Sequence, residues 1–464
     1  MSTKLGRSWW LLASTGVATF ALSACASYQP RPLAGADVEA LLQSPDREQL
    51  GRDASQLKHP LLKPVELDFS KPLTGDELAI ITVLANPDLR ASRTRQGVAD
   101  AQVFESGLLP DPQIGLGFDK VLSPNDPGMT SAYAASLSLD ILGALATRHT
   151  DRSIKQATAN QVRNDIVWEE WSTAGQARLL ARRWFYQSRA AALTREAMDS
   201  AERALQRALS AAEARDLKGD ELETRRIAAA DAREKALAAE RDADATRLDL
   251  NKLLGFKPDE RLTLAPPPPL QAWQRPDAEA LFAMARQQRL DLKALEQGYA
   301  SQEATLHRAV LGQYPRLNIT LNRSRDTSNV HTFGPAVNFD LPLWNRNRGA
   351  IATAKADREQ LRAEFIARLH QTRAEIAALV SALERDERAR AALHDQLPAI
   401  ERTAAAFAVA AAEHDVTQTD ADAARATAID KQLALLALEQ SCAEQRIALM
   451  LATGSPLSDL IDLP

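Results

Sequence analysis

Long stretches of the chain carry apolar residues at helical spacing, with almost no residue that would break a helix. Between about Ala144 and Leu217, glycine occurs only as Gly175 and proline does not occur. One helix over this stretch would be roughly 110 Å long at about 1.5 Å per residue, far beyond ordinary globular helices. The apolar positions are largely alanine, which favours close approach between helices. We therefore expect long helices that pack like coiled coils.

Four shorter segments alternate between apolar and polar residues, which is typical of strands with one apolar and one polar face. We expect these strands at about 112–120, 131–142, 315–324 and 333–343. The apolar positions are Ile114, Leu116, Phe118, Tyr133, Ala135, Leu137, Leu139, Ile141, Leu317, Ile319, Leu321, Phe333, Val337, Phe339 and Leu341. A membrane β-barrel and a soluble antiparallel sheet both give this alternation, so the pattern alone leaves the two open.

The chain also repeats itself. Asp88-Leu89-Arg90-Ala91 corresponds to Asp291-Leu292-Lys293-Ala294, and Leu139-Asp140-Ile141 corresponds to Phe339-Asp340-Leu341. The period is about 200 residues, much longer than the 20–50 residues of solenoid repeats. Each half runs helix, strand, strand, long helix, helix. The predicted fold class is therefore mainly α with a small β part, built from a duplicated half.

These patterns divide the chain into six segments. They are a signal peptide at 1–24, an N-terminal extension at 25–75, the first repeat at 76–256, a proline-rich linker at 257–275, the second repeat at 276–456, and a tail at 457–464. Within the repeats, helices are expected at 76–109 and 277–311 before the strands, and at 220–254 and 419–453 after the long helices.

The N-terminus has the features of a bacterial export signal. Lys4 and Arg7 precede the apolar run 9–22, and small residues lead to Cys25. This arrangement predicts that Cys25 is lipidated and begins the mature protein outside the cytoplasm. Ala26 stands where an inner-membrane retention signal would have Asp, which favours the outer membrane. An ordinary signal peptide with a chance cysteine is the alternative.

Composition and charge narrow the possible functions. The net charge is -5 and no basic block occurs, so we expect no nucleic-acid partner. Cys442 is the only other cysteine, so no internal disulfide is expected. The seven histidines lack metal-ligand spacing, and no phosphate-binding loop or nucleophile elbow occurs. We therefore expect no metal site, no cofactor and no enzymatic activity.

The number of strands limits how they could meet lipid. Four strands cannot close a barrel, because the smallest membrane barrels have about eight. Open strand edges in lipid would leave backbone groups unpaired at several kcal/mol each. Two chains would supply eight strands and three would supply twelve, and only a wider barrel leaves a water-filled lumen. If these strands lie in a membrane, several chains must share the barrel.

Ordered motifs over about residues 72–456 resemble outer-membrane efflux channels of the TolC type. They are Leu73-Thr74-Gly75-Asp76-Glu77-Leu78, Asn86-Pro87-Asp88-Leu89, Leu109-Pro110, Leu253-Leu254-Gly255 and Phe339-Asp340-Leu341-Pro342-Leu343-Trp344-Asn345-Arg346-Asn347-Arg348-Gly349. The last segment is similar to the heavy-metal (cobalt–zinc–cadmium) branch. The resemblance rests on the order and spacing of these motifs, which are present in both halves.

The resemblance implies a homotrimer with a twelve-stranded outer-membrane barrel and a long coiled-coil tunnel in the periplasm. It implies the exit channel of a tripartite efflux system, which passes metal ions or small toxic compounds outward. Its partners would be a periplasmic adaptor protein and an inner-membrane pump of the resistance-nodulation-division type. A periplasmic coiled-coil lipoprotein without a pore is the alternative.

The turns between the long and short helices would form the entrance and contact the adaptor. The residues implied are Lys218, Gly219, Asp220 and Glu221 in the first turn and Asp415, Val416 and Thr417 in the second. Gly219 is expected to supply the permissive backbone of the first turn. Asp415 stands where the family usually has glycine. These polar residues could also simply cap helices and remain solvated.

Asp420 and Asp422 follow the second turn. In a symmetric trimer each would form a ring of three carboxylates near the axis, which would favour cations and gate the pore. A solvated helix face is the alternative, because acidic residues are favoured in a first helical turn. Trp168 and Trp171 on the first long helix are expected to be packing anchors.

Overall fold

The computed structural model describes residues 28–33, 35–122, 129–217, 219–270, 273–315 and 317–455. The chain divides into two units, Met1–Ser44 and Pro45–Pro464. The first contains α2 (Ala36–Leu41), and all other labelled elements belong to the second. The predicted signal peptide and Cys25 lie outside the described residues, as does Lys218.

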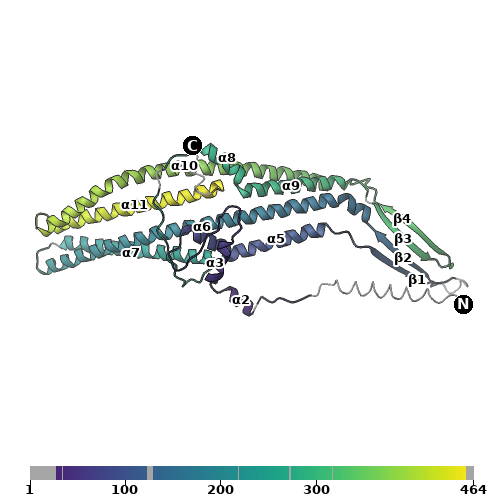
Figure 1. Cartoon of the computed structure of the whole chain (residues 1–464), viewed down its shortest axis with the longest axis horizontal. Helices are drawn as coiled ribbons and strands as arrows, with labels where there is room; N and C mark the ends of the chain where they lie inside the picture. The colour runs from purple at the N-terminus through teal and green to yellow at the C-terminus, as the bar shows by residue number, and fades with distance from the viewer. Residues whose placement is uncertain are drawn as a thin grey trace. The chain divides into compact units, whose positions relative to one another are not determined.

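The second unit is mainly helical with four antiparallel strands, which confirms the predicted fold class (Figure 1). Its helices are α3 (Arg47–Ser55), α4 (Gly75–Ala85), α5 (Pro87–Ser106), α6 (Ile141–Glu213), α7 (Gly219–Leu254), α8 (Ala278–Gln288), α9 (Leu290–Leu311), α10 (Arg348–Ala412) and α11 (Gln418–Thr453). Its strands are β1 (Gln113–Asp119), β2 (Ala132–Leu139), β3 (Leu317–Arg325) and β4 (His331–Phe339), in that order across one sheet.

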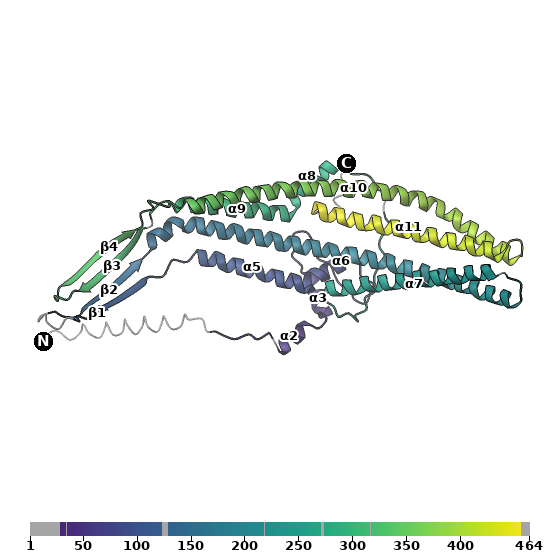
Figure 2. The same ribbon diagram turned by 180° about the vertical axis from the view of Figure 1, so that it is seen from behind.

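The two halves of the second unit match element by element. Helices α4 and α8 have 11 residues each, and α7 and α11 have 36 each. The long helices α6 and α10 have 73 and 65 residues, and α10 continues through Pro398. Helix α6 packs against α7, α9 and α11, and α10 packs against α9 and α11 (Figure 2). The helices thus form two long hairpins that lie side by side.

The helix before each pair of strands is broken, where we predicted one continuous helix. In the first half the break is at Asn86, whose extended backbone precedes Pro87. The Asn86 side chain accepts a hydrogen bond from the Leu89 N–H at 2.9 Å and so caps α5. In the second half the break is at Arg289, with φ -62° and ψ 120° and no proline after it. The proline accounts for the first break because it disfavours helical backbone in the residue before it.

The junctions between strands and long helices also differ from the prediction. Strand β2 ends at Leu139, and α6 begins two residues later, inside the predicted strand. Strand β4 likewise ends at Phe339, but α10 begins only at Arg348. Arg346 and Asn347 before α10 have left-handed backbone, with φ 46° and 52°. The first junction is therefore abrupt and the second contains a non-helical segment.

Two hydrophobic cores lie where the short helices meet the long ones. One surrounds Trp171, which is 1% exposed, with Ile376 and Met450 among its members. The other contains Leu78, Leu250 and Leu254. The burial of Trp171 confirms it as a packing anchor. Cys442 is buried and is a free thiol.

The linker between the halves pairs with the segment that precedes α4. The N–H of Leu73 donates to the Thr263 carbonyl, and the N–H of Ala265 donates to the Leu73 carbonyl, both at 2.8 Å. Immediately afterwards Thr74 and Glu77 form a reciprocal capping box at the start of α4. The linker and the N-terminal segment are thus fixed to each other beside α6.

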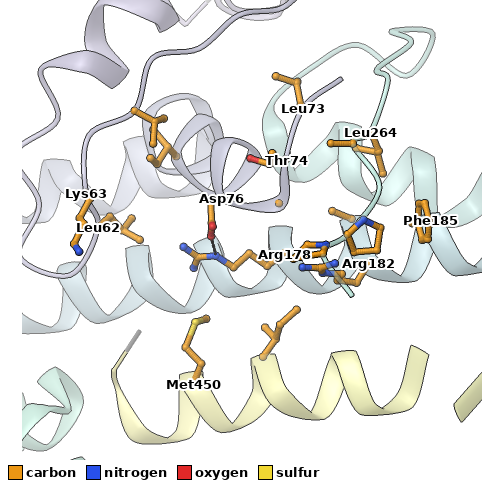
Figure 3. A pocket seen from close by; sticks show the side chains of 18 of the residues that line it. Leu62, Lys63, Leu73, Thr74, Asp76, Arg178, Arg182, Phe185, Leu264 and Met450 are labelled. Atoms are coloured by element: carbon orange, nitrogen blue, oxygen red, sulfur yellow. Dashed lines mark hydrogen bonds and ion pairs between the residues drawn. The ribbon is translucent and has the colours of Figure 1, made fainter. Parts of the chain in front are cut away.

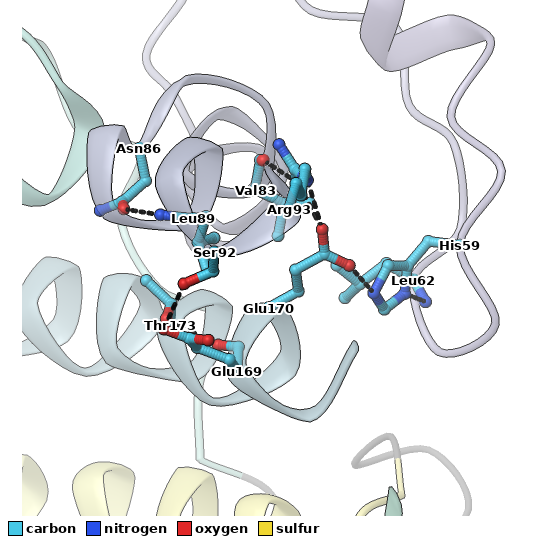
Figure 4. A network of polar contacts seen from close by, with 10 residues as sticks. All are labelled: His59, Leu62, Val83, Asn86, Leu89, Ser92, Arg93, Glu169, Glu170 and Thr173. Atoms are coloured by element: carbon cyan, nitrogen blue, oxygen red, sulfur yellow. Dashed lines mark hydrogen bonds and ion pairs between the residues drawn. The ribbon is translucent and has the colours of Figure 1, made fainter. Parts of the chain in front are cut away.

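A buried polar network anchors the N-terminal segment to α6 (Figure 4). The Nδ1 atom of His59 accepts the N–H groups of Leu61 and Leu62, each at 3.1 Å. This arrangement places the imidazole proton on Nε2, which lies 3.3 Å from the Glu170 carboxylate. Arg93 of α5 donates from Nε to the other Glu170 oxygen at 2.6 Å. Burial alone would raise the pKa of Glu170, but His59 and Arg93 outweigh it and hold this pKa below its ordinary value.

This network predicts an acid-dependent loss of stability. A carboxyl whose pKa is lowered by folding stabilises the fold above its ordinary pKa of 4.5, and this contribution disappears as the pH falls through the folded value. Removal of one partner from a fully buried ion pair costs about 3–5 kcal/mol. Because the side chain of Arg93 is partly exposed, we expect a smaller loss for Glu170→Gln, about 2 kcal/mol at pH 7. At pH 3.5 the difference between the two proteins should shrink.

Thermal unfolding followed by circular dichroism at both pH values measures this effect. Glu169→Gln is the matched control, because Glu169 is the neighbouring residue and its side chain is 39% exposed. An equal loss of stability at pH 7 and pH 3.5 would contradict the electrostatic explanation.

Candidate functional site

The two hairpin turns have the same backbone geometry. In the first, Arg215 has left-handed backbone (φ 63°), and the N–H of Asp216 donates to the Ala211 carbonyl at 2.9 Å. In the second, His414 has left-handed backbone (φ 66°), and the N–H of Asp415 donates to the Ala410 carbonyl at 2.9 Å. Both are Schellman-type helix ends, which usually place glycine at the left-handed position.

This geometry corrects the expected turn residues. Gly219 is the first residue of α7, so the permissive backbone position in the first turn is Arg215 and not Gly219. In the second turn the left-handed residue is His414, one residue before Asp415. Sequence reasoning missed both positions because neither Arg nor His is a usual signal of left-handed backbone.

The other predicted turn residues lie at the starts of the returning helices. Asp220 and Glu221 occupy the first turn of α7, where carboxylates interact favourably with the helix dipole. Thr417 caps α11, and Val416 is partly buried beside it. Asp220, Glu221, Asp415 and Thr417 are all exposed. The turns therefore present polar and mainly acidic side chains to solvent.

Asp420 and Asp422 have different surroundings. The hydroxyl of Thr417 donates to the Asp420 carboxylate at 2.6 Å and accepts the Asp420 N–H at 3.1 Å, so Asp420 takes part in the cap of α11. Asp422 accepts a hydrogen bond from Nη2 of Arg207 on α6 at 2.6 Å, and its side chain is 18% exposed. Asp420 is thus held within its own helix end, whereas Asp422 joins α11 to α6.

Three polar contacts tie the two hairpins together near their turns, and we call them the hairpin ties. They are Arg207 with Asp422, Arg225 of α7 with the Thr419 hydroxyl at 2.8 Å, and Arg425 of α11 with Glu196 of α6 at 2.5 Å. Exposed ion pairs contribute only about 0–1 kcal/mol each. The hairpins are therefore joined here by contacts that can break at small cost.

At the opposite end of the long helices, the strand register places the predicted apolar positions that lie in the strands on one face of the sheet. The prediction was wrong for Ile141, which begins α6, and for Leu341, which lies beyond β4. The rows across the strands include Ile114 beside Leu137, Leu137 beside Leu321, and Ile319 beside Val337. Many of these side chains are more than half exposed in the single chain. They include Ile114, Leu116, Phe118, Phe333, Val337 and Phe339. No layer of the described residues covers this face.

Aromatic and charged side chains border this face near the hairpin loops. The guanidinium of Arg325 lies 4.8 Å from the centre of the Tyr133 ring, and the rings of Tyr133 and His331 meet edge to face at 6.2 Å. Bands of amphipathic side chains of this kind border the apolar surface of membrane-spanning strands.

Small polar residues cover the other face of the sheet. Ser138 donates to the Asn318 side chain at 2.9 Å, and Ser324 and Thr332 are hydrogen-bonded at 2.7 Å. Asn338 reaches the Thr320 hydroxyl at 3.3 Å. The sheet thus has one apolar and one polar face, and among the described strands the outer ones, β1 and β4, each have one unpaired edge.

No helix among the described residues combines the length and apolar character needed to cross a membrane. The described side chains also contain no group of three or more metal-ligand residues that could hold an ion.

Comparisons with known proteins agree with this architecture. Residues 281–455 match the protein family described as outer membrane efflux protein. Proteins of this family are channels and not enzymes, in agreement with the sequence prediction. A search of curated proteins found no match.

Solved structures share the fold over most of the chain. A structure of CusC is 17% identical and covers 86% of this chain and 99% of its own, with a TM-score of 0.63. The CmeC outer membrane channel of Campylobacter jejuni is 15% identical over 94% of this chain and 97% of its own, with a TM-score of 0.69. The open MtrE outer membrane channel of Neisseria gonorrhoeae is 18% identical over 82% and 89%, with a TM-score of 0.63.

Proposed function

We propose that this chain, whose second half matches the outer membrane efflux family, is the exit channel of a tripartite efflux system. The observation that carries the proposal is the combination of an uncovered apolar sheet face at one end of the long helices with two hairpin turns at the other. A channel that spans the outer membrane and extends through the periplasm needs both features. A pore-free coiled-coil scaffold would need no sheet with an apolar surface.

The number of strands supports a homotrimer. Strands β1 and β4 each have an unpaired edge, and such edges in lipid cost several kcal/mol for every unpaired backbone group. Joining β4 of one copy to β1 of the next would pair every edge. Three copies of the four strands would give a twelve-stranded barrel, with the apolar face toward lipid and the small polar face toward a hydrated lumen.

The exposed turns are the proposed contact with the efflux partners. Asp220, Glu221 and Asp415 would present carboxylates to a periplasmic adaptor protein, which connects the channel to an inner-membrane pump of the resistance-nodulation-division type. The similarity of residues 339–349 to the heavy-metal branch supports metal ions as cargo, with small toxic compounds as the alternative. Lipidation of Cys25 would add an anchor in the outer membrane.

The hairpin ties are the proposed restraint on the entrance. We infer that Asp422 acts through its bond to Arg207 rather than as a bare carboxylate ring, because its side chain is largely buried in that pair. Loss of this tie should let the hairpins separate. Arg207→Ala and Asp422→Ala are therefore each expected to raise single-channel conductance or open probability several-fold in planar bilayers, since loss of a tie of up to about 1 kcal/mol shifts the balance between joined and separated hairpins by a factor of that size.

Arg226→Ala is the matched control for this experiment. Arg226 lies near the same turn and pairs with Glu223 within α7, so its loss leaves the hairpin ties intact. Discrete conductance steps that are unchanged in Arg207→Ala and Asp422→Ala would keep the channel but reject the restraint. Failure to find any membrane-inserted trimer would reject the channel and favour the scaffold.

A further inference from the structure

A cavity of about 560 Å³ lies beside α6, in the middle of the second unit (Figure 3). Its walls come from α4, α6, the last turns of α11, the segment before α4, and the proline-rich linker. Pockets that bind small molecules have volumes of about 300–1,000 Å³. This cavity is therefore large enough for a small ligand, and neither the hairpin turns nor the sheet contributes to it.

Most of the cavity wall is apolar. Phe185 of α6, Leu264 of the linker and Met450 of α11 face the cavity from three sides (Figure 3), and Pro266 and Pro268 also line it. The linker is held in place by its pairing with Leu73, which also lines the cavity. A ligand with an apolar ring or short chain would be in contact with a preformed surface.

The charged side chains in the wall are mainly cationic. Arg178, Arg182 and Lys63 contribute three positive charges, against one carboxylate, Asp76. Arg178 donates from Nε to Asp76 at 2.7 Å, but the Asp76 side chain is 74% exposed, so solvent shares that carboxylate. The cavity therefore retains a positive charge next to its apolar wall.

The two arginines also have hydrogen-bonding capacity that the protein does not use. Nη1 of Arg178 is buried and has no acceptor among the described residues. Arg182 makes no hydrogen bond or ion pair within the described part of the chain, and burial lowers the pKa of its guanidinium below the ordinary value. Arg182 is half-buried, so its unpaired guanidinium is available to an anion in the cavity, and charge-assisted hydrogen bonds of this kind are strong.

The spacing of these residues defines how a ligand would lie. Arg178 and Arg182 are four residues apart on α6, so their side chains leave the same face of the helix one turn apart. Phe185 is three residues beyond Arg182 on the same face. An anionic head at the arginines would thus have its apolar body against Phe185 and the linker.

We propose that this cavity is a binding site for small anionic amphiphiles, in which a carboxylate or sulfonate is attached to an apolar ring or short chain. The anion accepts hydrogen bonds from Arg178 and Arg182, whose planar guanidinium groups match a carboxylate. The apolar body occupies the space between Phe185, Leu264 and Met450. The proposed site shares no residue with the turns or the sheet, so ligand binding can be measured separately from transport activity.

The test measures binding of 2-naphthoate to the full-length protein in nanodiscs by saturation-transfer NMR, with empty nanodiscs as the blank. The neutral analogue 2-naphthalenemethanol has the same ring without the charge. We expect saturable binding of the anion and at least about tenfold weaker binding of the neutral compound, because only the anion pairs with the buried guanidinium groups.

Variants assign the binding to this cavity. Arg182→Gln should weaken naphthoate binding about tenfold, and Arg182→Lys should recover part of it. Leu264→Trp should abolish binding by filling the cavity without a change in charge, and it provides a second test if Arg182→Gln does not fold. Arg233→Gln on α7 is the control, because Arg233 is exposed and pairs with Glu202 outside the cavity.

Three outcomes would overturn the proposal. They are equal affinity for the anion and the neutral compound, an equal loss in Arg233→Gln, and binding that persists unchanged in Leu264→Trp.

Discussion

Replacing Leu321 with arginine should prevent assembly of the protein in the outer membrane, whereas the same replacement at the adjacent Asn322 should be tolerated. Leu321 lies in the middle of the apolar face, between Leu137 and Pro335 in the strand register. An arginine on the lipid face of a membrane strand costs about 2–4 kcal/mol near the centre of the bilayer. In the proposed trimer this cost is incurred once in every copy.

The measurement is the amount of heat-modifiable trimer in outer-membrane fractions, resolved by electrophoresis with and without boiling. Asn322→Arg is the matched control, because Asn322 is on the same strand but points to the polar face. Normal trimer levels in Leu321→Arg would contradict the assignment of the apolar face to lipid. Loss of trimer in both variants would also contradict it, because the effect would then not depend on which face carries the charge.

Replacing Trp171 with alanine should cause the largest loss of stability of any single truncation in the helical region. Trp171 is 1% exposed and is the largest fully buried side chain among the described residues. Truncation of a buried tryptophan typically costs about 3–5 kcal/mol, because it removes apolar contacts and leaves a cavity. Its core also joins α6 to α4, α8, α10 and α11, so the loss should loosen both halves.

Thermal or denaturant unfolding followed by circular dichroism measures this loss. Trp344→Ala is the matched control, because Trp344 is 87% exposed and should change the stability of the helical region little. Trp171→Phe should retain part of the stability, since an aromatic ring still fills much of the space. A loss below about 1 kcal/mol in Trp171→Ala would show that the site can collapse around the cavity.

Much of the fold could be predicted because it depends on local patterns. The alternation of apolar and polar residues predicted the strands and their faces, since a shift of one residue in the register would have placed Leu137 or Leu321 on the polar side. The scarcity of helix breakers predicted the long helices. The duplication predicted that both halves would contain the same elements, and the equal lengths of α7 and α11 agree with this.

The features that sequence reasoning missed depend on contacts between distant residues. Arg289 interrupts the helix without a proline, and its guanidinium, which pairs with the nearby Asp291, also donates to the Ala452 carbonyl across the fold. The tie between Arg207 and Asp422 joins residues from different halves. The cationic cavity likewise requires α4, α6 and the linker to meet. The spacing of residues within a short segment does not predict contacts between distant segments, so these contacts became apparent only in the folded structure.

The two junctions between sheet and helices have a mechanical consequence. Asp140 alone separates β2 from α6, so any rotation of α6 about its axis must turn β2 with it. Between β4 and α10 lies the non-helical segment 340–347, in which Arg346 and Asn347 have left-handed backbone. Asn347 is held there by a bond from its side chain to the Ala309 carbonyl at 2.7 Å. The hairpin of α6 and α7 is therefore coupled directly to the sheet, whereas the hairpin of α10 and α11 is connected to it through a non-helical segment that can take up part of a rotation.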